Sequence, residues 1–165
     1  MRIAEFRITR FQFARDRVIG DSQVHIADAN AAALELIADD GTVGLGFFGA
    51  LFAALPNQAE LERVFAEEAW PGLEGQPPAA LVHRVSRPRG GNQRGPSIPF
   101  GEAIQVALWD LAAKEVGLPL HRLLGSRRDR VEAYASGLDY HLSDDVCLRC
   151  VIELEAAGRH PERSS

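Results

Sequence analysis

Two cysteines stand at the spacing of a redox-active dithiol. Cys147 and Cys150 form a C-x-x-C motif, which supports disulfide exchange in thioredoxin-like proteins. Ser143 is a suitable N-cap for an amphipathic helix that carries both cysteines one turn apart, and this favours buried structural thiols. His141 and His160 flank the pair at spacings that match no standard zinc finger. We therefore predict no metal site here and keep CxxC redox chemistry as a remote alternative.

A glycine-rich segment matches a nucleotide-binding motif. Gly44, Gly46 and Gly49 fit G-x-G-x-x-G, in which the backbone holds a pyrophosphate where a strand meets a helix. Here a hairpin turn at Asp40-Gly41 leaves almost no strand before the first glycine, and no βαβ unit follows. We expect these glycines to serve the geometry of a strand end.

A cluster of arginines and one aspartate are the remaining candidates for binding or catalysis. The cluster lies in a Pro/Gly-rich segment without the lysine and hydroxyl of a P-loop, which favours a solvated loop over a phosphate site. Its members are Arg84, Arg87, Arg89 and Arg94. Asp110 is expected to be a hydrogen-bonded structural carboxylate, not a general base. No catalytic residue is predicted.

The composition is that of an ordinary globular domain. The 165 residues are 46% apolar and 25% charged, with a net charge of −5. That charge argues against a nucleic-acid surface, and no apolar run reaches the length of a membrane span. The N-terminus lacks the apolar block of a signal peptide, and there are only two cysteines. A cytoplasmic location is therefore expected.

Three antiparallel strands are predicted in the first third of the chain. Ala4, Phe6 and Ile8 alternate with polar residues, which is typical of a half-buried strand. The polar, mixed-charge residues 15–30 are interpreted as a long loop. Residues 31–38 and 42–48 then flank an Asp-Gly hairpin turn and form the second and third strands.

Helices come after the strands. Asn57 is expected to cap a helix that has Glu60 three residues later and ends at Trp70-Pro71. Pro78 suits the first turn of a second helix reaching to about residue 85. A third helix is indicated by apolar residues at helical spacing, Ile104, Ala107, Leu108, Leu111 and Ala112. Gly117 and Pro119 end it. The order predicts an α+β domain over residues 1–125.

The third helix and the segments after it resemble a known family. The segments are Ala107-Leu-Trp-Asp-Leu-Ala-Ala-Lys114, Gly117-Leu-Pro119, Leu123-Leu-Gly125 and the apolar residues from Val131. Together they resemble the mandelate racemase/muconate-lactonizing branch of the enolase superfamily. The resemblance implies an enolase-like N-terminal capping domain over residues 1–125, a three-stranded antiparallel meander followed by a helical bundle. It also implies that residues 126–165 are a truncated start of a (β/α)8 TIM barrel, one β-α unit long.

The resemblance implies an activity whose chemical groups lie elsewhere. Family enzymes remove the proton α to a carboxylate with a lysine or histidine base, and Mg²⁺ stabilises the resulting enediolate. Those groups belong to later barrel strands, and the polar residues after Gly158 do not continue the pattern. We therefore expect an N-terminal fragment of a Mg-dependent acid-sugar dehydratase or racemase, inactive alone.

The same resemblance assigns three residues to a substrate site. Phe47 and Phe48 would lie on a loop over the barrel mouth, with core packing as the alternative, and Ser136 would end the first barrel strand. The substrate would be a small carboxylate or acid sugar, and Mg²⁺ would bind only in the full-length enzyme. The unpaired barrel segment favours self-association. The alternative function is a stand-alone α+β binding module.

Overall fold

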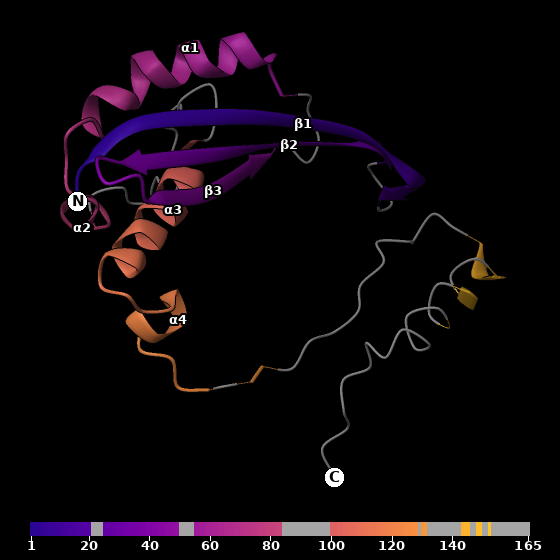
Figure 1. The fold of residues 1–165 in the computed structure, drawn as a ribbon. Helices are drawn as coiled ribbons and strands as arrows, with labels where there is room; N and C mark the ends of the chain where they lie inside the picture. The colour runs from indigo at the N-terminus through magenta and orange to yellow at the C-terminus, as the bar shows by residue number, and fades with distance from the viewer. Residues whose placement is uncertain are drawn as a thin grey trace, which may run out of the picture. The chain divides into compact units, whose positions relative to one another are not determined.

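Strands precede helices in the described part of the chain (Figure 1). The computed structural model describes residues 1–20, 25–49, 55–83, 100–128, 130–131, 143–145, 148–149 and 152. The strands are β1 (Ile3–Gly20), β2 (His25–Ala38) and β3 (Val43–Gly49), hydrogen-bonded in the order β1-β2-β3. The helices are α1 (Gln58–Glu68), a 3-10 turn (Trp70–Gly72), α2 (Pro78–Leu81), α3 (Phe100–Glu115) and α4 (Leu120–Leu123). The predicted meander and the helices within residues 1–125 are confirmed, except that the second helix ends at Leu81 and not near residue 85.

The chain forms two compact units. The first joins Met1–Gln12 to Asn30–Ser126 and holds most of the sheet and all of the helices named above. The second joins Phe13–Ala29 to Arg127–Ser165. The predicted barrel strand and helix after residue 131 fall almost wholly outside the described residues. The boundary between domains at residues 125 and 126 stays a prediction.

The hairpin between β2 and β3 forms where the Asp-Gly pair predicted it. Ala33 pairs with Phe47 and Ile37 with Val43 in an antiparallel register. Gly41 has a φ of 84°, a conformation that favours glycine. The Asp40 carboxylate accepts a hydrogen bond from the Thr42 N–H at 2.9 Å, which lowers the pKa of Asp40.

The prediction of a long loop over residues 15–30 is wrong. β1 continues to Gly20 and β2 begins at His25, so most of this polar stretch is extended strand. Strands that are hydrogen-bonded neighbours satisfy their backbone groups through the ladder between them, and the ladder does not require an apolar face. The alternation of apolar and polar residues therefore underestimates strand length where no core lies beneath.

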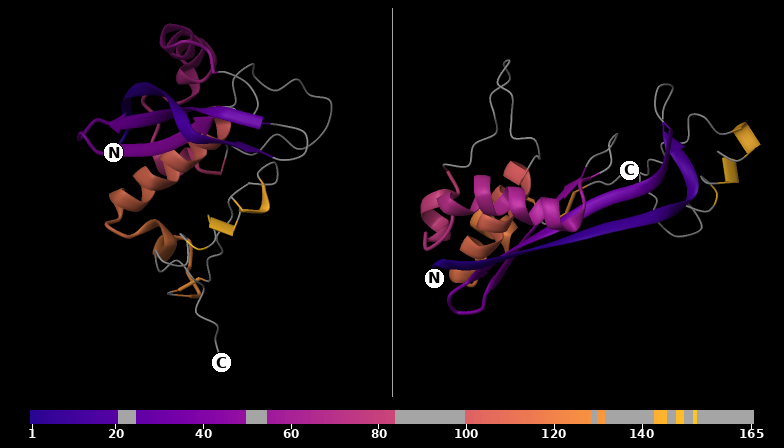
Figure 2. Two further views of the ribbon diagram at one scale, coloured as in Figure 1. Left: turned by 90° about the vertical axis from the view of Figure 1, so that its right-hand side faces the viewer. Right: turned by 90° about the horizontal axis from the view of Figure 1, so that it is seen from above.

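Helices α1 and α3 cover the same face of the sheet (Figure 2, right). Aromatic rings join the layers: Phe65 of α1 lies 5.1 Å from Phe100 of α3 and 4.7 Å from Phe6 of β1, between ring centroids. On β1, Ile3 and Ile8 are buried, whereas Ala4, predicted to point inward, is exposed. Both Ala4 and Glu5 face solvent, so the strand changes its buried parity there.

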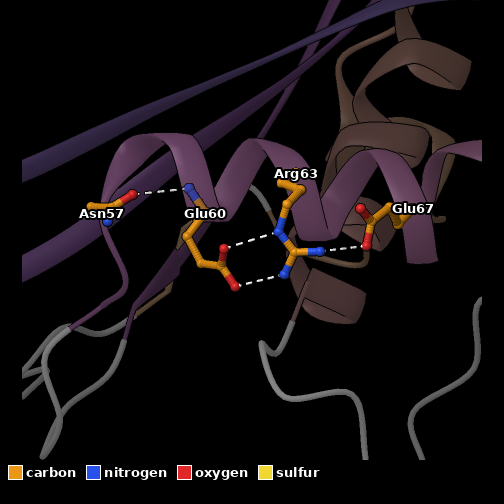
Figure 3. Close-up of polar contacts among 4 residues, drawn as sticks. All are labelled: Asn57, Glu60, Arg63 and Glu67. Carbon is orange, nitrogen blue, oxygen red and sulfur yellow. Dashed lines mark hydrogen bonds and ion pairs between the residues drawn. The ribbon is translucent and has the colours of Figure 1, made fainter.

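Helix α1 begins as predicted. The Asn57 side chain accepts a hydrogen bond from the Glu60 N–H at 2.9 Å, which satisfies one of the free donors of the first turn (Figure 3). Along the exposed side, Arg63 binds Glu60 at 2.8 Å and also pairs with Glu67. These contacts lower the pKa of Glu60, chiefly through its hydrogen bond with Arg63, and raise that of Arg63.

The last two helices end at glycines. Gly117 has a φ of 66°, and the Leu118 N–H reaches back to the Ala113 carbonyl at 3.0 Å, which is the Schellman arrangement. Gly125 repeats it after α4, with a φ of 75°. Both glycines belong to the segments that carry the family resemblance, so these parts of the motif are helix stops.

Candidate functional site

Strand β3 presents two different faces. Gly44, Gly46 and Phe48 are buried beneath α3, while Leu45 and Phe47 alternate with them and are exposed on the other side of the strand. Phe47 is 60% exposed and Phe48 only 6%. The Phe48 ring packs edge-on against Phe100 with centroids 5.1 Å apart. Of the two aromatic candidates for substrate contact, only Phe47 is accessible.

The G-x-G motif allows α3 to approach β3 closely. A Cβ on Gly46 would lie 2.0 Å from the Ala103 carbonyl oxygen, and one on Gly44 would lie 2.3 Å from that of Ala107. Both distances are well inside van der Waals contact, so only glycine fits. The role is helix packing, not the strand-end geometry that we predicted, and no strand-to-helix phosphate loop is formed by these residues.

Asp110 is a structural carboxylate, as predicted. It accepts hydrogen bonds from the Leu45 backbone N–H at 3.0 Å and from the Lys114 ammonium at 2.8 Å. Lys114 also donates to the Val43 carbonyl at 2.7 Å. Asp110 and Lys114 both belong to the motif of the third helix, and together they fasten α3 to the outer edge of β3.

A polar junction that no sequence motif predicts lies where β1 leaves the core. The Arg10 guanidinium donates to Gln12 at 3.1 Å, Asn30 at 3.4 Å and the Leu55 carbonyl at 3.5 Å. Its Nε is shielded from solvent and has no partner among the described residues. The sequence does contain one signal for this junction. Arg10 lies on the same inward-facing side of the strand as Phe6 and Ile8, and a cation in that position needs hydrogen-bond acceptors.

The remaining predicted site residues lie outside the described residues. These are Ser136, Cys147, Cys150, His141, His160 and the arginines from Arg84 to Arg94. Within the described ranges, no polar or charged side chain is buried, and no three His, Cys, Asp or Glu side chains are grouped to hold a metal. A desolvated acid or base is the usual source of catalytic proton transfer, and the described residues provide none.

Residues 22–125 match a known protein family, the mandelate racemase / muconate lactonizing enzyme N-terminal domain. The chain belongs to this family. The resemblance seen in the third helix is thereby confirmed, and the match extends back through α1, β3 and the whole of β2.

Relatives of the family domain include enzymes of acid-sugar metabolism. D-galactarolactone cycloisomerase of Agrobacterium fabrum is 39% identical over 111 residues, which are 63% of this chain and 27% of that protein. A D-galactonate dehydratase family member of Halomonas elongata is 34% identical over 136 residues, covering 75% and 31%. The chain thus spans about a third of the length of these relatives.

Solved structures share the fold. A Mesorhizobium loti protein assigned as a mandelate racemase is 65% identical, with a TM-score of 0.80 over 88% of this chain and 38% of that one. The dipeptide epimerase of Enterococcus faecalis, complexed with Mg and a dipeptide, has a TM-score of 0.72 at 22% identity, over 96% and 44%. No helix in the described ranges of this chain is long and apolar enough to cross a membrane.

Proposed function

We propose that this chain serves as the capping domain of an enzyme that removes the α-proton of a small carboxylate or acid sugar. The family match over residues 22–125 is the observation that carries the proposal. The reaction is that of a dehydratase, cycloisomerase or racemase, the classes to which the similar proteins belong. Because the described residues hold no buried acid or base, the chain is proposed to be inactive by itself.

Phe47 is proposed as the substrate-facing residue of the cap. It lies near the end of β3 with most of its ring exposed, while the alternating backbone buries Phe48 in the core. An exposed aromatic ring on a rigid strand is suited to cover the apolar face of a substrate and exclude water. Ser136 remains a proposed second contact.

Magnesium is proposed only for the longer family enzyme. The Enterococcus faecalis epimerase, which shares the fold, was crystallised with Mg. The described residues of this chain offer no group of three candidate ligands, so they do not fit a magnesium site. The contribution of the cap is therefore proposed to be shape and water exclusion, while the proton and the metal are handled by other residues.

A chimera tests the capping role. Residues 1–125 of this chain replace the corresponding part of the Mesorhizobium loti protein, to which the chain is 65% identical. The intact parent is first screened for α-proton exchange in D₂O with a panel of acid-sugar carboxylates and Mg²⁺, read by NMR. We expect the chimera to exchange the same substrate as the parent, and the 165-residue chain alone to exchange none.

Two controls make the test decisive. Circular dichroism and solution mass show whether the chimera is folded. A folded chimera without exchange activity would overturn the capping role, and exchange by the isolated chain would overturn its inactivity. Phe47→Ala in the chimera is expected to raise KM with little change in kcat, because the residue binds substrate but moves no proton.

A stand-alone binding module is the second candidate, favoured by exposed apolar side chains. In the second unit Val131, Leu148 and Ile152 are exposed, and such residues invite association. Self-association through this segment is proposed. A cytoplasmic location is proposed as well, because the sequence holds only two cysteines. A monomer that resists protease through residue 165 would favour the binding module, whereas a mass that rises with concentration would favour self-association.

A further inference from the structure

Each outer strand of the three-stranded sheet has one edge without a neighbouring strand. In the order β1-β2-β3, β2 is paired on both sides, whereas β1 and β3 are each paired on one side among the described residues. A free edge presents unpaired N–H and C=O groups and can pair with a strand of another molecule. The side chains along these edges therefore decide whether the sheet can grow.

The edge of β3 is occupied by an ion pair from α3. Lys114 donates to the Val43 carbonyl at 2.7 Å, and the Leu45 N–H donates to Asp110 at 3.0 Å. Asp110 and Lys114 are themselves 2.8 Å apart. The carbonyl of one strand residue and the N–H of the second residue after it point to the same side of a strand. The pair thus occupies two of the outward-facing backbone groups that an added strand would use.

The edge of β1 is occupied in the same pattern by a single side chain. The Gln58 amide accepts from the Arg10 N–H at 3.0 Å and donates to the Ile8 carbonyl. Again the groups are a carbonyl and the N–H two residues later. Gln58 is the first residue of α1, so at each edge of the sheet a helix supplies the closing groups. The repetition of one pattern with different residue types indicates a requirement for closed edges.

We infer that Asp110 and Lys114 keep β3 from pairing with β3 of a second copy of this chain. The strand Val43–Gly49 carries no charged residue, and its face away from α3 displays Leu45 and Phe47, 38% and 60% exposed. An uncharged apolar strand is prone to self-pairing, and identical edges pair readily about a two-fold axis. The ion pair is the only charged group bound to the β3 backbone among the described residues.

A matched pair of double variants tests the inference in the full chain. Asp110→Leu with Lys114→Met removes the i,i+4 ion pair on the strand edge, and Arg63→Met with Glu67→Leu removes one on the exposed side of α1. Both leave the net charge of −5 unchanged. Mass is measured by light scattering on a sizing column over a range of concentrations. We expect a twofold rise relative to the wild type only for the first variant.

A second measurement needs no disruptive variant. In the wild-type chain, the Leu45 amide should exchange with D₂O at least about fivefold more slowly than an unprotected amide, as a hydrogen bond of ordinary strength implies. Asp110→Asn keeps a side-chain oxygen acceptor and should retain both protection and the wild-type mass. If Asp110 only stabilised the helix, it would not slow the exchange of the Leu45 amide relative to an unprotected amide.

The mass measurements and the exchange of the Leu45 amide together decide whether the inference holds. Dimers from the edge variant with an unchanged mass for the α1 variant would support the inference, as would slow Leu45 exchange. A folded edge variant that keeps the wild-type mass at every concentration would overturn it. If that variant does not fold, unprotected exchange of Leu45 in the wild-type chain would overturn it instead.

Discussion

Gly46 lies so close to Ala103 that an added Cβ would sit 2.0 Å from the Ala103 carbonyl oxygen. Gly44 has the same relation to Ala107, one helical turn away. Two residues along a strand advance about 6.6 Å, and four residues along a helix about 6 Å. The two repeats nearly coincide, so alternate residues of β3 meet successive turns of α3.

Replacing Gly46 with alanine should destabilise the domain strongly. The new methyl group would collide with backbone, which cannot rotate away, and we expect a loss of about 3 kcal/mol in the free energy of unfolding. Urea denaturation measures it. Gly101→Ala is the control, because that glycine lies in α3 with open space around it, and it should be neutral or stabilising by up to about 1 kcal/mol.

Phe48→Ala and Phe47→Ala should separate the two neighbouring aromatic residues. Phe48 packs against Phe100 in the core, so its truncation should cost about 3–5 kcal/mol of unfolding free energy. Phe47 is mostly exposed, so its truncation should change stability by no more than about 0.5 kcal/mol. Equal losses in thermal or urea unfolding would contradict the assignment of Phe48 to the core and Phe47 to the surface.

Asn57→Ala should cost about 1 kcal/mol, because the Glu60 N–H would lose its acceptor. Asn57→Asp keeps an oxygen at the same place and should retain the stability, with a further favourable charge at the helix N-terminus. Chemical denaturation of the three proteins in parallel checks the order. An alanine variant as stable as the wild type would contradict the stabilising role of Asn57 as the N-cap of α1.

The pairing of Glu60 with Arg63 should make part of the stability depend on pH. The pKa of Glu60 is lowered in the folded chain, chiefly by its hydrogen bond with Arg63. Its contribution is therefore present above the ordinary pKa of a glutamate and is lost as pH falls through the lowered value. The difference in unfolding free energy between the wild type and Arg63→Met should shrink from about pH 7 to about pH 3. It should also shrink in about 1 M salt, where the screening length is about 3 Å.

Local features of the fold could be read from the amino-acid order. The hairpin turn needs only Gly41 and its aspartates, the start of α1 needs only Asn57, and the end of α3 needs only Gly117. Each depends on backbone preferences and on hydrogen bonds between residues a few positions apart. The family, likewise, was detectable from motif residues close together in the chain.

The candidate site could be predicted only in part. The sequence alone does not distinguish the neighbours Phe47 and Phe48. Helix α3 packs on one face of β3, and this buries Phe48 and leaves Phe47 exposed. The junction at Arg10 draws its acceptors from three separate parts of the chain. The full length of β1 and β2 was missed, because their pairing does not require alternating apolar residues.

The sequence by itself determined where turns, caps and helix stops lie, and which family the chain resembles. Only the tertiary structure decided what the motif residues do: Gly44 and Gly46 admit a helix, and Asp110 with Lys114 closes a strand edge. The physical reason is the separation in the sequence between the residues that interact. Turns and caps are governed by neighbours in the chain, whereas close packing and edge pairing join residues more than fifty positions apart.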